Sequence, residues 1–149
     1  MSVVQPPRFA PETTHVSGRR YIAHAADGLV LLVLFLVVGV PAGIVSSGLL
    51  LAVLVVWLTV GQVAYYVLTQ RQSGRTPGKR LMGIRVVDAE GRTPGTAALI
   101  RRTVPLLVEY FYVIAWLSMM TSSYRQRVGD RWADTYVIAD PLPSPVRAE

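Results

Sequence analysis

Long apolar runs separated by polar segments set the pattern of this chain. The first run covers residues 21–40 and the second covers residues 49–69, so each holds about 20 residues. An α-helix rises about 1.5 Å per residue, and about 20 residues therefore cross a hydrocarbon core roughly 30 Å thick. The pattern predicts two membrane-spanning helices, with Pro41 ending the first one and a tight uncharged turn leading to the second.

A third apolar run, at residues 103–120, is shorter and is interrupted by Pro105 and Glu109. Its length is compatible with a tilted span, a re-entrant segment or a helix that lies in the membrane interface. The apolar pattern alone leaves these three alternatives open.

Two short segments have the character of strands. Residues 84–87 and residues 135–138 are rich in branched and aromatic side chains, and turn residues follow the first of them. Either strand alone would leave an unpaired edge. We therefore expect the two segments to pair with each other.

The polar segments complete the predicted organisation. Residues 1–18 contain three prolines and no periodicity, which is typical of a flexible aqueous arm. Residues 70–102 form a basic loop, in which a helix is expected to begin near Thr96. The proline-rich residues 140–149 predict a disordered tail. A single membrane domain is therefore expected over residues 19–139.

The distribution of positive charge orients these segments. Three of the 15 Lys and Arg residues precede the first span, eight lie between the second and third runs, and four follow the third run. Positive residues stay on the cytoplasmic side of a membrane, so the amino terminus and the basic loop are predicted to be cytoplasmic. A single crossing by the third run would put the last four arginines outside. We therefore expect the third run to dip and return, with the strands pairing on the cytoplasmic face.

Composition agrees with this class of protein. Hydrophobic residues make up 52% of the chain and charged residues only 16%, which is too apolar for an ordinary soluble domain. The predicted fold is an all-α membrane protein, a small helical bundle of two spans plus a third span or re-entrant helix, with a short cytoplasmic β pair. The net charge of +6 lies beside apolar spans, so the lipid bilayer and not a nucleic acid is the expected partner.

The first span carries two charged residues on one face. Asp27 follows Arg20 by seven residues, which is close to two helical turns. A charge placed inside a membrane is costly unless it faces protein or water. We expect Asp27 to meet a donor from another segment, such as Arg101 or Arg102, and His24 to share this cluster.

Two roles for this cluster stay open. In the first, it is a structural clamp that fixes how the helices pack. In the second, Asp27 and Glu109 take up and release a proton or a cation, since a buried carboxylate with a raised pKa does so near neutral pH. For Asp130, which lies in a polar segment, a helix cap or an arginine partner is expected.

Several classes of site are not predicted. The chain has no cysteine, and its two histidines lack a cluster of further ligands, so no metal site is expected. The glycine-rich turn that leads to Lys79 is one residue shorter than a phosphate-binding loop requires. Lys79 and Arg80 are instead predicted to contact lipid headgroups. Without a nucleophile and base pair, a metal or a phosphate loop, neither enzymatic activity nor a cofactor is expected.

Three ordered motifs resemble the RDD family of small bacterial membrane proteins. They are Arg20 with Asp27 on the first span, TPGKRLMGIRVVDAEG after the second span, and QRVGDRWADTYVI near the end. The family is named for one arginine and two aspartates, and Arg20, Asp27 and Asp130 stand at the matching positions.

The resemblance covers about residues 19–139, with one departure. Asp134 stands where the family's closing motif commonly has glycine, which bears on how closely this segment packs. The resemblance implies a multi-pass protein of the bacterial cytoplasmic (inner) membrane and a link to transport of unidentified ligands, with cation and proton exchange proposed for some members. It implies no cofactor and no established catalytic site.

Two functional hypotheses follow. The first is a transport-related membrane protein that acts as a homo-oligomer, because so few short spans cannot enclose a path alone. The second is a non-catalytic accessory or assembly subunit of a larger membrane complex. Acidic residues within the apolar runs favour the first hypothesis, whereas the small size of the chain favours the second.

Overall fold

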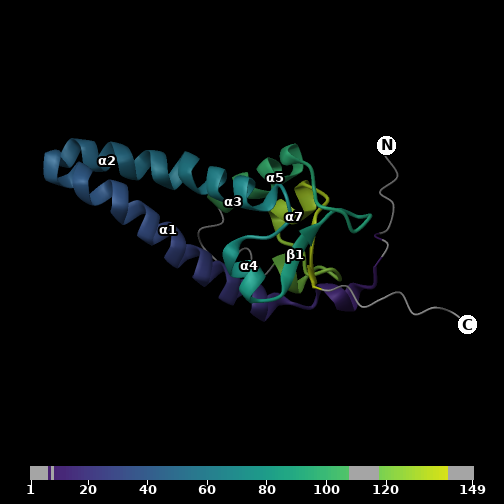
Figure 1. Cartoon of the computed structure of the whole chain (residues 1–149). Helices are drawn as coiled ribbons and strands as arrows, with labels where there is room; N and C mark the ends of the chain where they lie inside the picture. Colours follow the sequence, from purple (N-terminus) through teal and green to yellow (C-terminus); the bar gives the residue numbers. More distant parts are fainter. Residues whose placement is uncertain (1–6, 8, 108–117, 141–149) are drawn as a thin grey trace, which may run out of the picture.

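The computed structural model describes residue 7, residues 9–107 and residues 118–140. Within this part, a long helical hairpin projects from a smaller unit of short helices and two strands (Figure 1). We call this smaller unit, built from residues 71–107 and 118–140 together with the docked residues 9–16, the polar unit. Among the described residues, the hairpin carries most of the apolar ones, and the polar unit closes its base.

The first helix of the hairpin, α1 (Ser17–Val45), is longer than predicted and does not end at Pro41. Proline removes one backbone donor, and an apolar helix tolerates that loss where neighbouring groups satisfy the freed carbonyl. The helix ends at Ser46, whose backbone is extended and whose hydroxyl accepts a hydrogen bond from the Leu49 amide at 3.1 Å. Ser46 therefore makes the tight turn and caps the second helix.

The second helix runs without a break through α2 (Ser47–Val56), a π-helical turn η2 (Trp57–Gly61) and α3 (Gln62–Gln70). It agrees with the span predicted at residues 49–69. The Trp57 ring lies against Phe35 of α1, with centroids 6.2 Å apart.

The hairpin exposes many large apolar side chains. Leu29 is 63% exposed, Val37 67% and Ile44 81%. Soluble monomers rarely expose apolar patches larger than about 300–600 Å². Two helices in the described part are long and apolar enough to cross a bilayer, and their uncovered surface is suited to lipid.

After the hairpin, the polar unit is built from short helices and two strands. They are α4 (Pro77–Leu81), β1 (Ile84–Val87), α5 (Thr96–Thr103), η3 (Val104–Leu107), α7 (Val128–Trp132) and β2 (Tyr136–Ala139). The strands pair antiparallel, with Ile84 opposite Ala139 and Val87 opposite Tyr136. The predicted pairing is confirmed.

Both faces of the strand pair are covered. Ile84, Val86 and Val137 pack against Val16 and Ala23 at the start of α1. On the opposite face Val87, Tyr136 and Ile138 pack with Phe9 and Tyr124. Side chains alternate between the two faces of a strand, so one short pair joins α1 to the N-terminal segment.

The N-terminal segment differs from the predicted flexible arm. The Phe9 ring meets Tyr136 edge to face at 5.2 Å between centroids. A 3₁₀ helix, η1 (Pro11–Thr14), follows, and its last residue Thr14 is fully buried. The arm predicted at residues 1–18 is therefore docked from Phe9 onward, because an aromatic contact distant in sequence outweighs the lack of periodicity.

Most of the third apolar run lies outside the described residues, as do Glu109 and the tail beyond Asp140. The described residues at its two ends are close together: Thr103 at its start and Met119 near its end line the same cavity. A segment that crosses a bilayer once separates its ends by about 30 Å.

The short helices α4 and α7 end in the same way. Gly83 follows α4 with φ of 60°, and Asp134 follows α7 with φ of 48°, so both adopt the left-handed conformation. After α7, the Thr135 amide donates to the Asp130 carbonyl at 2.9 Å and the Asp134 amide donates to Arg131 at 3.4 Å. This pair of bonds is the Schellman ending, which favours glycine at the position that Asp134 holds. Asp134 therefore keeps the close packing at a conformational cost.

Replacing Asp134 with glycine is expected to stabilise the protein by about 1 kcal/mol, because glycine adopts positive φ without steric penalty. The measurement is the midpoint of thermal unfolding of purified protein in detergent. Gly83→Ala is the matched control, because it places a Cβ on a residue with positive φ and should lower stability. The added Cβ would meet only Asp140, at 3.6 Å, so the effect would come from the backbone conformation and not from a collision. We expect the midpoint to rise for Asp134→Gly and to fall for Gly83→Ala; a lower midpoint for Asp134→Gly would contradict this account.

Candidate functional site

Asp27 is buried at the base of the hairpin, where three donors from other segments reach it. Its Oδ1 accepts hydrogen bonds from the Tyr65 hydroxyl at 2.9 Å and from the Gly78 amide at 2.8 Å. Its Oδ2 accepts a hydrogen bond from the Thr76 hydroxyl. Asp27 therefore connects α1 to α3 and to the beginning of α4.

These donors differ from the arginines that were predicted. Arg101 is exposed, and Arg102 pairs with Asp130. Asp27 does meet another segment, as expected, but two of its donors belong to the turn at residues 76–78. A backbone amide and a threonine hydroxyl carry no charge, so a search for charged partners in the sequence finds the arginines and misses these two donors.

The sequence Thr76-Pro77-Gly78 explains why α4 fits against α1. The Thr76 hydroxyl accepts from the Lys79 amide at 3.2 Å, so Thr76 caps α4, and Pro77 occupies the first helical turn. A Cβ on Gly78 would collide with the Ala23 carbonyl oxygen of α1. Only glycine therefore lets the turn approach closely enough to bond Asp27.

Asp130 holds the second charged contact of the site. It is fully buried and forms ion pairs with Arg20 of α1 and with Arg102 of α5, the latter at 2.9 Å. Its Oδ2 also accepts a hydrogen bond from the Arg127 amide at 3.1 Å, which caps α7. The structure thus gives Asp130 both the helix cap and the arginine partner that its sequence context predicts.

The charges around Asp130 set its protonation. Burial alone would raise the pKa of this carboxyl, but the guanidinium groups of Arg102, Arg20 and Arg127 outweigh burial and hold the pKa below its ordinary value. Asp130 is therefore ionised at neutral pH and neutralises buried arginines.

Arg20 and Asp27 lie on one face of α1, as their spacing predicts, but they serve different partners. Arg20 reaches Asp130 and also donates to the Arg125 carbonyl at 2.9 Å. Asp27 reaches the α4 turn. One face of α1 therefore binds two separate parts of the polar unit, α7 through Arg20 and the start of α4 through Asp27.

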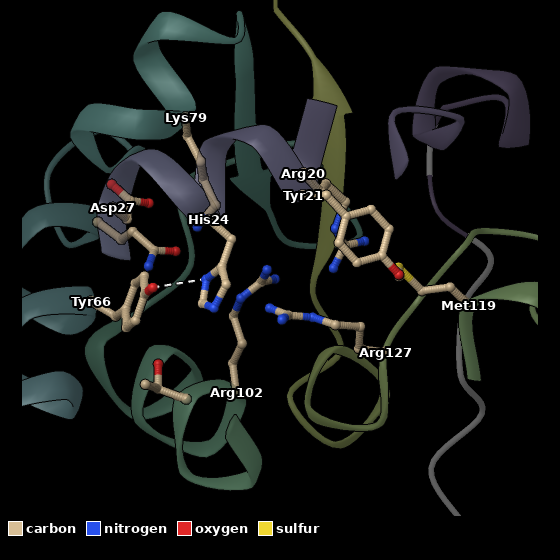
Figure 2. A pocket seen from close by; sticks show the side chains of 11 residues that line it. Arg20, Tyr21, His24, Asp27, Tyr66, Lys79, Arg102, Met119 and Arg127 are labelled. Atoms are coloured by element: carbon tan, nitrogen blue, oxygen red, sulfur yellow. Dashed lines mark hydrogen bonds between the residues drawn. The ribbon is translucent and has the colours of Figure 1, made fainter. Parts of the chain in front are cut away.

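A cavity opens between these two contacts (Figure 2). It is lined by residues of α1, α3, α4 and α5 and by Met119 and Arg127, and its volume is about 40 Å³. A cavity of roughly 10–15 Å³ is the least that holds a buried water, so this one is large enough for water or for a small polar group. Its charged lining residues in the described part of the chain are Arg20, Lys79, Arg102, Arg127 and Asp27.

Lys79 is placed differently from its predicted contact with lipid headgroups. Its side chain is only 9% exposed, and its Nζ lies 5.8 Å from the centre of the Tyr66 ring. Burial lowers the pKa of Lys79, and so do the charges of Arg102 and Arg127, whereas Asp27 acts in the opposite sense. The neighbouring Arg80 is exposed and does not line this cavity, so the two adjacent cations, which were predicted to lie together at the surface, are separated.

His24 lies in the same cavity as Asp27. Its Nδ1 and the Tyr66 hydroxyl are 2.9 Å apart, and the two rings stack with centroids 5.9 Å apart. Tyr65 and Tyr66 have the sequence character of interfacial anchors. In the structure the Tyr65 hydroxyl donates to Asp27, and the Tyr66 hydroxyl pairs with His24.

Comparison with known proteins gives one match. The model of the RDD family matches residues 16–134, a range that contains Arg20, Asp27 and Asp130. No curated protein and no solved structure matches the chain.

Replacing Gly78 with alanine is expected to destabilise the protein by about 3 kcal/mol, because the added Cβ meets backbone atoms of α1 that cannot rotate away. The measurement is the free energy of unfolding in detergent. Gly28→Ala is the matched control, because nothing lies within 4 Å of its Cβ position. Equal stability of Gly78→Ala and Gly28→Ala would contradict the close approach of α4 to α1.

Proposed function

Because this chain belongs to the RDD family, whose model matches residues 16–134, we propose that it is a transport-related membrane protein that holds a charged solute at the base of its hairpin. The observation that carries this proposal is the cavity whose lining concentrates four cationic side chains of the described residues. Buried charges are costly, and apolar residues of similar size would hold helices together at least as well. Their presence around a cavity therefore favours a binding role.

The proposed location is the bacterial cytoplasmic membrane, with the amino terminus in the cytoplasm. Basic residues flank the base of the hairpin, and the turn at Ser46 has no charged neighbours. Because Thr103 and Met119 line one cavity, we place both ends of the third run on the same side. A run that dips and returns would keep the arginines after it on the cytoplasmic side.

An oligomer is part of this proposal. The two long helices of the described residues cannot enclose a path across a membrane by themselves, and the apolar side chains of α2 are largely exposed. Association of several copies through the hairpins would supply the missing walls. The exposed apolar surface is suited to packing against other copies of the hairpin, and it is equally suited to contact with lipid.

For Asp27, the geometry favours the clamp over proton or cation exchange. Its oxygens accept three hydrogen bonds that hold α1, α3 and α4 together. A carboxylate with these contacts is a structural joint, and loss of its charge weakens all three contacts. Exchange of a proton or cation at Asp27, with Glu109, is the alternative that a flux measurement decides.

An accessory role in a larger membrane complex is the second candidate. The observation in its favour is the same uncovered surface of the second helix, which a partner's helices would cover as well as lipid does. This role requires a partner that stays bound when the protein is extracted from its membrane.

Native protein reconstituted in liposomes is expected to carry ions at a rate above that of empty liposomes. The measurement uses imposed proton, sodium, potassium and phosphate gradients, each followed by a suitable indicator. Lys79→Gln is expected to reduce the flux about tenfold or more, because it removes a buried cation of the cavity. Arg80→Gln is the matched control, since this adjacent side chain is exposed and its removal leaves the cavity intact.

Asp27→Asn separates the two roles of this residue. A lower unfolding midpoint supports the clamp, whereas a folded protein that loses proton or cation flux supports exchange at Asp27. Folded native protein without flux under any of these gradients, purified with a stoichiometric partner, would overturn the transport proposal and favour the accessory role.

A further inference from the structure

The charges around the cavity do not balance. Arg20, Lys79, Arg102 and Arg127 line it, and Asp27 is the carboxylate among its described lining residues. Asp130 is not among the lining residues, and it forms ion pairs with Arg20 and Arg102. Counting both carboxylates against the four basic side chains leaves two of these side chains without a matching acid.

The basic side chains in excess are Lys79 and Arg127. Neither side chain has a carboxylate within ion-pair distance among the residues that the structure describes. Both side chains line the cavity, and Lys79 is more than nine-tenths buried. Buried cationic groups normally have partners, so an occupant with negative charge would complete this site.

A further donor opens into the same space. The Tyr21 hydroxyl is buried and has no hydrogen-bond partner among the described residues, and Tyr21 lines the cavity. Figure 2 shows the side chains of Arg102, Arg127 and His24 turned toward a shared space, with Lys79 approaching from α4. An acceptor placed there would meet donors from several directions.

We infer that this cavity binds an oxyanion of the phosphate class through Lys79, Arg127 and Tyr21. The inference deepens the proposed function, on which it rests, by naming the class of solute. A cation would meet several positive groups and one carboxylate that already accepts three hydrogen bonds. An oxyanion accepts from ammonium, guanidinium and hydroxyl donors at once, and a cavity larger than the least that holds a water admits a small oxyanion group.

Two sources supply this chemistry: free inorganic phosphate and the phosphodiester headgroup of an anionic lipid. The cavity is lined by residues near the start of α1 and near the end of α3, where the hairpin joins the polar unit. Lipid phosphates lie at the boundary between the apolar core and water, so a headgroup and a dissolved ion both reach this level.

The experiment measures binding, not transport. Inorganic phosphate is titrated calorimetrically into purified full-length protein in uncharged detergent, and the titration is repeated in phosphatidylcholine nanodiscs with and without phosphatidylglycerol. Lys79→Gln and Arg127→Gln are each expected to weaken binding about tenfold or more, because each removes a charge-assisted hydrogen bond. Arg80→Gln, with its exposed side chain, is the matched control and is expected to bind as the native protein does.

The two sources give different results. If free phosphate is the ligand, phosphatidylglycerol leaves the affinity of the protein for phosphate unchanged. If a lipid headgroup is the ligand, phosphatidylglycerol competes with phosphate for the site. In that case it also raises the unfolding midpoint of the native protein more than that of Arg127→Gln. Arg127 is half-buried, so this variant tests the inference even if Lys79→Gln fails to fold.

The inference is overturned if folded native protein shows neither phosphate binding nor a response to phosphatidylglycerol, or if Arg80→Gln weakens binding as much as Arg127→Gln. Phosphate binding without any flux supports the oxyanion site and removes the transport role. Flux without phosphate binding and without a phosphatidylglycerol response supports the transport role and removes the oxyanion site. The experiment therefore distinguishes failure of the oxyanion site from failure of the transport role.

Discussion

One face of α1 carries a cation and an anion, and both charges have to be satisfied by segments that lie far away in sequence. Arg20 finds Asp130 of α7, and Asp27 finds the turn that begins α4. Breaking one partner of a buried pair leaves an uncompensated charge, which costs about 3–5 kcal/mol. The hairpin and the polar unit are therefore held together by a small number of polar contacts in place of a large apolar core.

The helices α4 and α7 provide the partners of Asp27 and Arg20, and the two helices share the same local structure. Each places a glycine against the carbonyl oxygen of another helix, Gly78 against Ala23 and Gly129 against Arg102. Each then ends in a residue with positive φ and leads into a strand, and the two strands pair. The residue after the glycine differs: in α4 it is Lys79, whereas in α7 it is Asp130. Asp130 neutralises the arginines around it, and Lys79 adds a further cation, which is why the cavity is left with positive charge.

The sequence predicts those features that depend on local pattern. The length of the apolar runs indicates the two hairpin helices, and branched residues in two short segments indicate the strand pair. Pro41 misleads, because the loss of one backbone donor does not end a helix whose other bonds remain. The donors to Asp27 escape prediction because they lie 38, 49 and 51 residues away and include a backbone amide. Burial of Lys79 and docking of Phe9 likewise depend on tertiary contacts that no single segment encodes.

The most direct test of this account is a double-mutant cycle between Arg20 and Asp130, built from Arg20→Met, Asp130→Asn and the double variant. The free energy of unfolding in detergent is measured for all four proteins, with Arg92 and Glu90, an exposed pair at 3.3 Å, as the reference cycle. We predict a coupling of about 1–3 kcal/mol for the buried pair, with the double variant losing less stability than the sum of the single variants. The exposed pair is predicted to couple by less than about 1 kcal/mol. Additive losses at Arg20 and Asp130 would contradict the claim that this contact joins the hairpin to the polar unit.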